Sequence, residues 1–138
     1  MSSVFCVLAG NGHYVRLFHR DPPADLAGPI ELSESAAAFE LMMIEFVDNN
    51  GKYASTWVYE PDGKFVTLIG AKVNGTSSKT VYSKWKTVLI DGTKIDTGFA
   101  SDGRSYMTTE IRLDGSIAAG QQEDYLAITT VIGVRRSG

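Results

Sequence analysis

The sequence predicts a mainly β fold: an antiparallel meander that forms a barrel or a strongly curved sheet, with an α+β arrangement as the alternative. Seven Asn-Gly or Asp-Gly pairs occur in the 138 residues, and both residue types tolerate the backbone of hairpin turns. From Gly51 onward, the glycines of these pairs are 12, 12, 17, 11 and 12 residues apart. Strands between turns of this spacing are typical of an antiparallel meander.

The composition predicts one soluble globular domain over residues 1–138. Hydrophobic residues make up 43% of the chain and charged residues 21%, close to the average for globular proteins. A net charge of −3 argues against a nucleic-acid binder, and no apolar run approaches the roughly 18 residues of a membrane span. The apolar stretch 4–9 is too short for a signal peptide and the single Cys6 cannot form an internal disulfide, so we expect a cytoplasmic protein.

The first fifty residues are predicted to hold a hairpin and a helix. Residues 4–9 and 13–20 have the character of strands joined at Asn11-Gly12, and Pro22-Pro23 ends the second of them. We then predict one helix near residues 34–48, because its apolar residues recur at i, i+3, i+4, i+7 and i+8. These residues are Phe39, Met42, Met43, Phe46 and Val47.

The same segment has an alternative interpretation as a strand. Residues 39–47 would then pair with residues 53–59 across a turn at Asn50-Gly51. Alternation of apolar and polar residues is poor here, because Glu40 and Glu45 fall on opposite sides of a strand. We therefore favour the helix.

The remainder of the chain is predicted to form strands, which are rich in Val, Ile, Thr, Tyr and Trp. The five stronger candidates are 53–59, 65–73, 80–90, 104–113 and 125–134. Two weaker candidates are 93–99 and 116–119. A sheet of this size leaves edges to cover, so we also expect a homo-oligomer.

Several of these strands have one aliphatic side and one side of Tyr, Trp, Thr and Ser. The mixed sides either form the surface around an aliphatic core or line a pocket, because Tyr and Trp combine apolar rings with polar tips. On the pocket hypothesis, the ligand-binding residues are Trp57, Tyr59, Arg16 and Tyr14.

The strand 104–113 carries three further candidates on one side. Tyr106, Glu110 and Arg112 are separated by even numbers of residues, so their side chains lie on the same side of the strand. Glu110 and Arg112 are roughly 6.6 Å apart. In an enclosed site, Glu110 would act as a general acid or base and Arg112 would hold a carbonyl or carboxylate oxygen. These three residues are the catalytic candidates, and the alternative is an ion pair at the surface.

We expect neither a metal nor a cofactor. The two histidines, His13 and His19, are about 20 Å apart along one strand and so cannot share an ion. The sequence contains no glycine-rich phosphate loop and no nucleophile elbow.

Three functions remain open. The first is a barrel that binds a small, mostly apolar molecule, which the aromatic faces and the lack of catalytic motifs favour. The second is a cofactor-free isomerase or cyclase whose cavity holds the substrate near its reactive geometry. The third is a structural or assembly protein, such as a viral or secretion-system component, which the uneven charge favours: −5 over residues 1–69 and +2 over residues 70–138.

Overall fold

The computed structural model describes residues 13–21, 29–48, 51–74, 80–96, 106–112, 116–118 and 126–136. Within these ranges, only the backbone is described for residues 71–74, 80–82, 84, 106–112 and 117–118. The predicted strand 4–9, its turn at Asn11-Gly12 and Cys6 lie outside the described residues.

The described chain is mainly antiparallel β structure, which confirms the mainly β and antiparallel part of the predicted fold class. Its strands are β1 (Tyr14–His19), β2 (Ile30–Glu31), β3 (Phe39–Asp48), β4 (Tyr53–Tyr59), β5 (Phe65–Asn74), β6 (Thr80–Asp91), β7 (Lys94–Asp96), β8 (Tyr106–Arg112), β9 (Ile117–Ala118) and β10 (Leu126–Arg135). One short 3-10 turn, Ala36–Ala38, precedes β3, and the hydroxyl of Ser35 accepts a hydrogen bond from the amide of Ala37 at its start.

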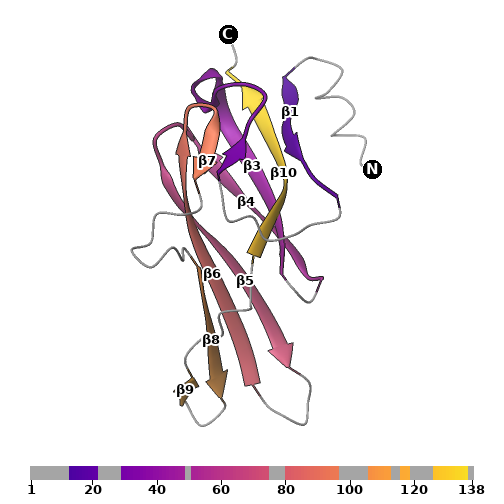
Figure 1. The fold of residues 1–138 in the computed structure, drawn as a ribbon, viewed down its shortest axis with the longest axis vertical. Helices are drawn as coiled ribbons and strands as arrows, with labels where there is room; N and C mark the ends of the chain where they lie inside the picture. Colours follow the sequence, from indigo (N-terminus) through magenta and orange to yellow (C-terminus); the bar gives the residue numbers. More distant parts are fainter. Residues whose placement is uncertain are drawn as a thin grey trace.

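These strands form two sheets (Figure 1). Sheet A has the order β1-β10-β3-β4, and sheet B has the order β2-β7-β6-β8-β9 with β5 paired to β6. All the pairs are antiparallel. A closed barrel is not found among the described residues. In Figure 1, β5, β6 and β8 of sheet B continue below the lower end of sheet A.

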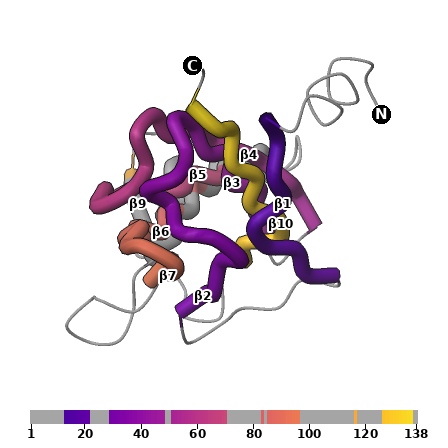
Figure 2. Tube along the Cα trace, turned by 90° about the horizontal axis from the view of Figure 1, so that it is seen from above, coloured from indigo at the N-terminus to yellow at the C-terminus, as the bar shows by residue number. Residues whose placement is uncertain are grey.

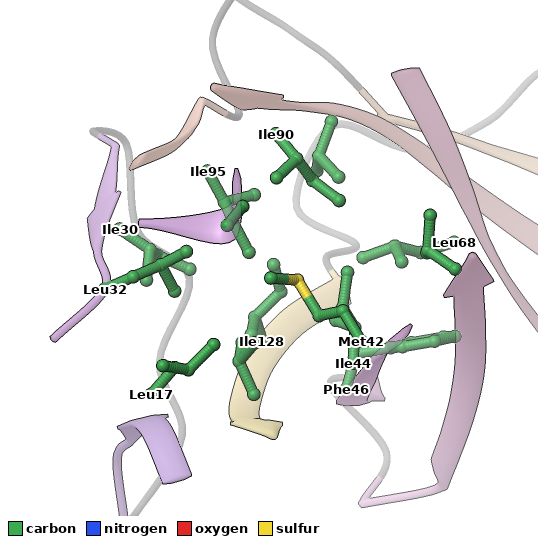
Figure 3. Packing of buried hydrophobic residues seen from close by; sticks show 14 of the residues in the cluster. Leu17, Ile30, Leu32, Met42, Ile44, Phe46, Leu68, Ile90, Ile95 and Ile128 are labelled. Atoms are coloured by element: carbon green, nitrogen blue, oxygen red, sulfur yellow. The ribbon is translucent and has the colours of Figure 1, made fainter. Parts of the chain in front are cut away.

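The core lies between the two sheets, and the inner face of each sheet contributes aliphatic side chains to it. Figure 3 shows Met42, Ile44 and Phe46 of β3 close to Leu68 of β5. Ile90 of β6 belongs to the same buried cluster. Viewed from above in Figure 2, β6 and β7 lie on one side of the molecule and β1 and β10 on the other.

The helix predicted near residues 34–48 is wrong, and the alternative strand is confirmed. Residues 39–48 form β3, which pairs with β4 across the turn at Gly51 and places Met43 opposite Trp57. No α-helix occurs in the ranges that the structure describes.

A bulge in β3 explains the helix-like spacing of its apolar residues. Val134 lies opposite Leu41 but Arg135 lies opposite Phe39, so the register shifts at Glu40. The shift places Phe39 on the inner face together with Met42, although the two are three residues apart. A strand with one bulge therefore has the i, i+3 spacing that also indicates a helix.

Candidate binding face

The four predicted ligand-binding residues lie in two neighbouring rows on the outer face of sheet A. The outer strands β1 and β4 contribute two each, and β10 and β3 lie between them. The first row is Tyr14, Val134, Leu41 and Tyr59, each opposite the next across the sheet. The second row is Arg16, Ile132, Met43 and Trp57. Sheet formation thus brings together residues more than forty positions apart in the sequence.

The aromatic side chains of β4 face solvent. The exposed fractions of Tyr53, Trp57 and Tyr59 are 58%, 52% and 60%, whereas Val58 between the last two is buried in the core. Trp57 and Tyr59 are therefore not walls of an enclosed cavity, which corrects the pocket geometry expected above. The physical reason is strand alternation: Val58 and Ala54 occupy the inner positions of β4, so their neighbours point outward. Whether these residues bind a ligand stays a prediction.

We call this surface the aromatic face. It comprises Tyr53, Trp57 and Tyr59 on β4, together with Tyr14 and Arg16 on β1. Nearer the middle of the sheet, Ile132, Val47 and Ala127 point to the same side, but they are buried and do not belong to the core cluster. The exposed aromatic rings of the face therefore lie at its β4 margin.

A third row supplies polar groups beside the rings. It contains His19, Thr130, Glu45 and Ser55, in this order across the sheet. The hydroxyl of Thr129, at a bulge of β10, donates to Glu45 Oε1 at 2.6 Å and fixes that carboxylate. His19 Nδ1 lies 3.0 Å from the Thr130 hydroxyl. The aromatic rings thus have hydrogen-bonding groups within one or two rows.

Tyr53, Ser55 and Glu45 lie on this side of sheet A but were not among the ligand-binding residues predicted from the sequence. Tyr53 and Ser55 share their side of β4 with Trp57, and that parity is visible in the sequence. Glu45 was not predicted to belong to a binding site, because the predicted helix would place it on the side opposite the apolar residues of the same segment. The pairing of Glu45 with Ser55 becomes evident only when residues 39–48 are read as a strand.

The three predicted catalytic residues do not join the aromatic face. Tyr106, Glu110 and Arg112 belong to β8 in sheet B, where they lie opposite residues 86, 82 and 80 of β6. Their side chains lie outside the described part of the chain, so their catalytic role stays a prediction.

Two findings concern other kinds of site. Among the described residues, no group of three or more His, Cys, Asp or Glu side chains is arranged to hold a metal ion. No helix in the described ranges is both long enough and apolar enough to cross a bilayer.

An ion pair marks the Tyr59 end of the aromatic face. Arg136, just after β10, forms a salt bridge with Glu60, just after β4. The hydrogen bond from Arg136, together with its charge and that of Lys64, holds the pKa of Glu60 below its ordinary value of 4.5 despite some desolvation. Close by, the Tyr59 hydroxyl donates to Glu40 Oε1 at 3.4 Å and Lys64 Nζ donates to the Tyr59 carbonyl at 2.6 Å. These contacts join the end of β4 to Glu40 on β3 and to Lys64, which immediately precedes β5.

This ion pair predicts a small stability difference that depends on pH. Because the pKa of Glu60 is lowered in the folded state, the pair stabilises the protein above the ordinary pKa and loses this effect as pH falls through the folded value. Glu60→Gln should therefore lower the melting temperature near neutral pH, and the difference from wild type should shrink below about pH 4. Both side chains are well exposed, so the effect is small. Glu31→Gln on β2 is the control, and a difference for Glu60→Gln that is constant from about pH 7 to about pH 3 would contradict the interpretation.

Comparison of the chain with protein-family models, curated proteins and solved structures finds no match. A function therefore has to be inferred from the chemistry of the aromatic face. Exposed rings at the margin of a sheet can cover one side of a ligand and leave its other side in water. This arrangement suits an amphipathic ligand that lies flat against the rings.

Proposed function

We propose that this protein is a binding protein whose aromatic face recognises an extended glycan. The observation that carries this proposal is that three half-exposed aromatic rings, those of Tyr53, Trp57 and Tyr59, lie along the same side of one strand. Exposed aromatic residues in a cluster are a costly arrangement for a surface without a partner, since their rings favour burial.

The chemistry of a sugar matches such a face. A sugar ring has a face of C–H groups, which stacks on an indole or phenol ring, and an edge of hydroxyl groups, which hydrogen-bonds to polar side chains. The polar row that contains Glu45, Ser55 and His19 runs across the sheet beside Trp57. A sugar stacked on Trp57 would therefore have both acceptors and donors within reach.

The dimensions favour a chain of sugars over a single one. Tyr53 and Tyr59 are six residues apart, which corresponds to about 20 Å along a strand. From β1 to β4 the sheet measures about 14 Å, given three strand spacings. A ligand that contacts all three rings must therefore be extended along β4.

The openness of the face favours a glycan over the small apolar molecule expected from sequence. A pocket for an apolar ligand covers most of the ligand surface, which an open sheet face does not do. A glycan loses less by remaining half hydrated, because its outward hydroxyl groups keep their water partners.

The proposal predicts that Trp57→Ala weakens glycan binding. A panel of immobilised glycans would identify a ligand for the wild-type protein, and calorimetric titration would then give the dissociation constant of each variant. We expect Trp57→Ala to raise the dissociation constant by about tenfold or more, and Tyr59→Ala to raise it by less. The reason is that a central Trp contributes about 1.4 kcal/mol or more of binding free energy at many interfaces.

The matched control is Trp85→Ala, since Trp85 is also exposed but lies on the outer face of sheet B. This variant should bind as wild type does, and all variants should keep wild-type melting temperatures to within a few degrees. Failure of the wild-type protein to bind any glycan of the panel, or an equal loss of affinity in Trp57→Ala and Trp85→Ala, would contradict the proposal.

A further inference from the structure

Among the described residues, sheet A ends at β1 on one side and at β4 on the other, and these two edges differ in how they are protected. At one edge, β1 contains Arg16 and His19 and has a bulge at Leu17. At the other edge, β4 reads Tyr-Ala-Ser-Thr-Trp-Val-Tyr, with no charged residue, no proline and an unbroken register with β3. Charges and bulges are the usual devices that keep an edge strand from pairing with another chain. The residues of β4 itself include none of these devices, and Lys64 places a charge at this edge, where its Nζ donates to the Tyr59 carbonyl at the end of the strand.

The backbone of β4 offers hydrogen-bonding groups to this edge. The amide of Asp48 donates to the carbonyl of Lys52 at 3.0 Å, and the amide of Glu60 donates to the carbonyl of Glu40 at 2.7 Å. In an antiparallel ladder such pairs alternate, so the even-numbered residues of β4 bond to β3. The odd-numbered residues, among them Ser55 and Trp57, direct their N–H and C=O groups to the opposite edge.

We propose that β4 pairs antiparallel with β4 of a second copy of this chain, across a two-fold axis at Thr56. Ser55 then lies opposite Trp57 of the second copy, and Tyr53 lies opposite Tyr59. The residues that bond across the axis are odd-numbered, so the outward N–H and C=O groups of Ser55 and Trp57 meet those of the second copy in register. The outward carbonyl of Tyr59 accepts from Lys64 Nζ, which would move aside when Tyr53 of the second copy pairs there.

Charge favours a second copy as the occupant of this edge. A two-fold contact places identical strands side by side, so a charged strand would bring like charges together. None of the seven residues of β4 is charged, and the net charge of the chain is only −3. The cross-axis neighbours are instead aromatic and hydroxyl side chains, which form favourable pairs across strands.

The pairing would also join two aromatic faces. Sheet A would continue into the sheet of the second copy, and the rings of both β4 strands would share one outer face. The inference goes beyond glycan binding and does not depend on it, because it rests on the β4 edge alone.

A single cysteine tests the register. In the paired sheet, Thr56 lies opposite Thr56 of the second copy in a non-hydrogen-bonded pair, for which the two Cα atoms are about 4.5 Å apart. That separation lies within the range of disulfides. In a Cys6→Ser background, Thr56→Cys should therefore form a disulfide-linked dimer under mild oxidation, visible on a non-reducing gel and reversed by reductant.

Ala54→Cys in the same background is the matched control. Residue 54 lies on the same inner side of β4 but opposite residue 58 of the second copy, so the two introduced cysteines are about 13 Å apart along the ladder. It should form no dimer. Equal cross-linking of the two variants, or none in Thr56→Cys, would overturn the proposal.

A second variant tests the contact without a cross-link. Ser55→Pro removes an amide that points away from β3 and leaves the bonds between β4 and β3 in place. We expect the wild-type protein to sediment as a dimer and Ser55→Pro to sediment as a monomer with the far-UV spectrum of wild type. A wild-type monomer at high concentration, or a Ser55→Pro dimer, would also overturn the proposal.

Discussion

Met42→Asp is expected to unfold the protein, whereas Met43→Asp is expected to leave it folded. Met42 is fully buried on the inner face of β3, and an unpaired carboxylate there costs several kcal/mol. That is a large part of the 5–15 kcal/mol that typically stabilises a domain. Met43 lies on the outer face between Ile132 and Trp57 and is only partly buried, so the same substitution costs about 1 kcal/mol.

Urea denaturation followed by circular dichroism would measure both effects. The pair is informative because a helix and a strand make different predictions for neighbouring residues: the predicted helix would place Met42 and Met43 on the same apolar face. Similar losses of stability in the two variants would therefore contradict the strand and the buried inner face of β3.

Gly133→Ala is expected to destabilise the protein by about 1–3 kcal/mol, the usual cost of overfilling a packed core. A Cβ atom at Gly133 would lie 2.6, 2.7 and 2.8 Å from three carbon atoms of the Phe39 ring. The ring has little room to move, because Phe39 is fully buried and the Arg135 guanidinium lies 5.1 Å from its centroid. The glycine is thus required by a close approach between β10 and the bulged start of β3.

The cause of this effect can be isolated with a second substitution. Phe39→Leu removes the ring that the new methyl group would meet, so Gly133→Ala should cost much less in a Phe39→Leu background than in wild type. Chemical denaturation of the four proteins of this cycle gives the interaction energy directly. Additive losses, or a Gly133→Ala variant as stable as wild type, would show that the two residues do not compete for space.

The turns explain why the strands after residue 51 could be predicted closely. Gly51, Gly63 and Gly92 all have positive φ, the backbone conformation for which Asn-Gly and Asp-Gly pairs are suited. The predicted strand 53–59 is observed with the same bounds, and the strands predicted at 65–73 and 80–90 each extend one residue further. Local turn chemistry is enough to place such strands, because it requires no knowledge of distant partners.

Residues 34–48 could not be predicted in this way, because their pattern depends on a distant strand. The bulge at Glu40 exists only in the pairing of β3 with β10, some ninety residues later in the chain. Without that partner, the spacing of Phe39 and Met42 indicates a helix. A bulge is a property of two strands together, and periodicity within one strand does not reveal it.

The aromatic face could be predicted only in part, because the sequence shows which residues share a side of a strand but not which side faces the core. Alternation within β4 places Trp57 and Tyr59 on one side, and alternation within β1 places Tyr14 and Arg16 on one side. Which side faces the core depends on how β1 and β4 pair with β10 and β3, and single-strand alternation carries no information on that choice. The residues were therefore grouped correctly in each strand, but they were assigned to an enclosed pocket when they lie on an outer face.

The fluorescence of Trp57 provides the most direct test of the proposed function. The chain has two tryptophans, so Trp85→Phe leaves Trp57 as the only one. Titration with a glycan that binds the wild-type protein should then shift the emission of Trp57 to shorter wavelength and saturate at the calorimetric dissociation constant, because the sugar replaces water on the exposed indole. Emission that stays constant while the glycan saturates the protein would contradict the account, since the ligand would then bind away from the aromatic face.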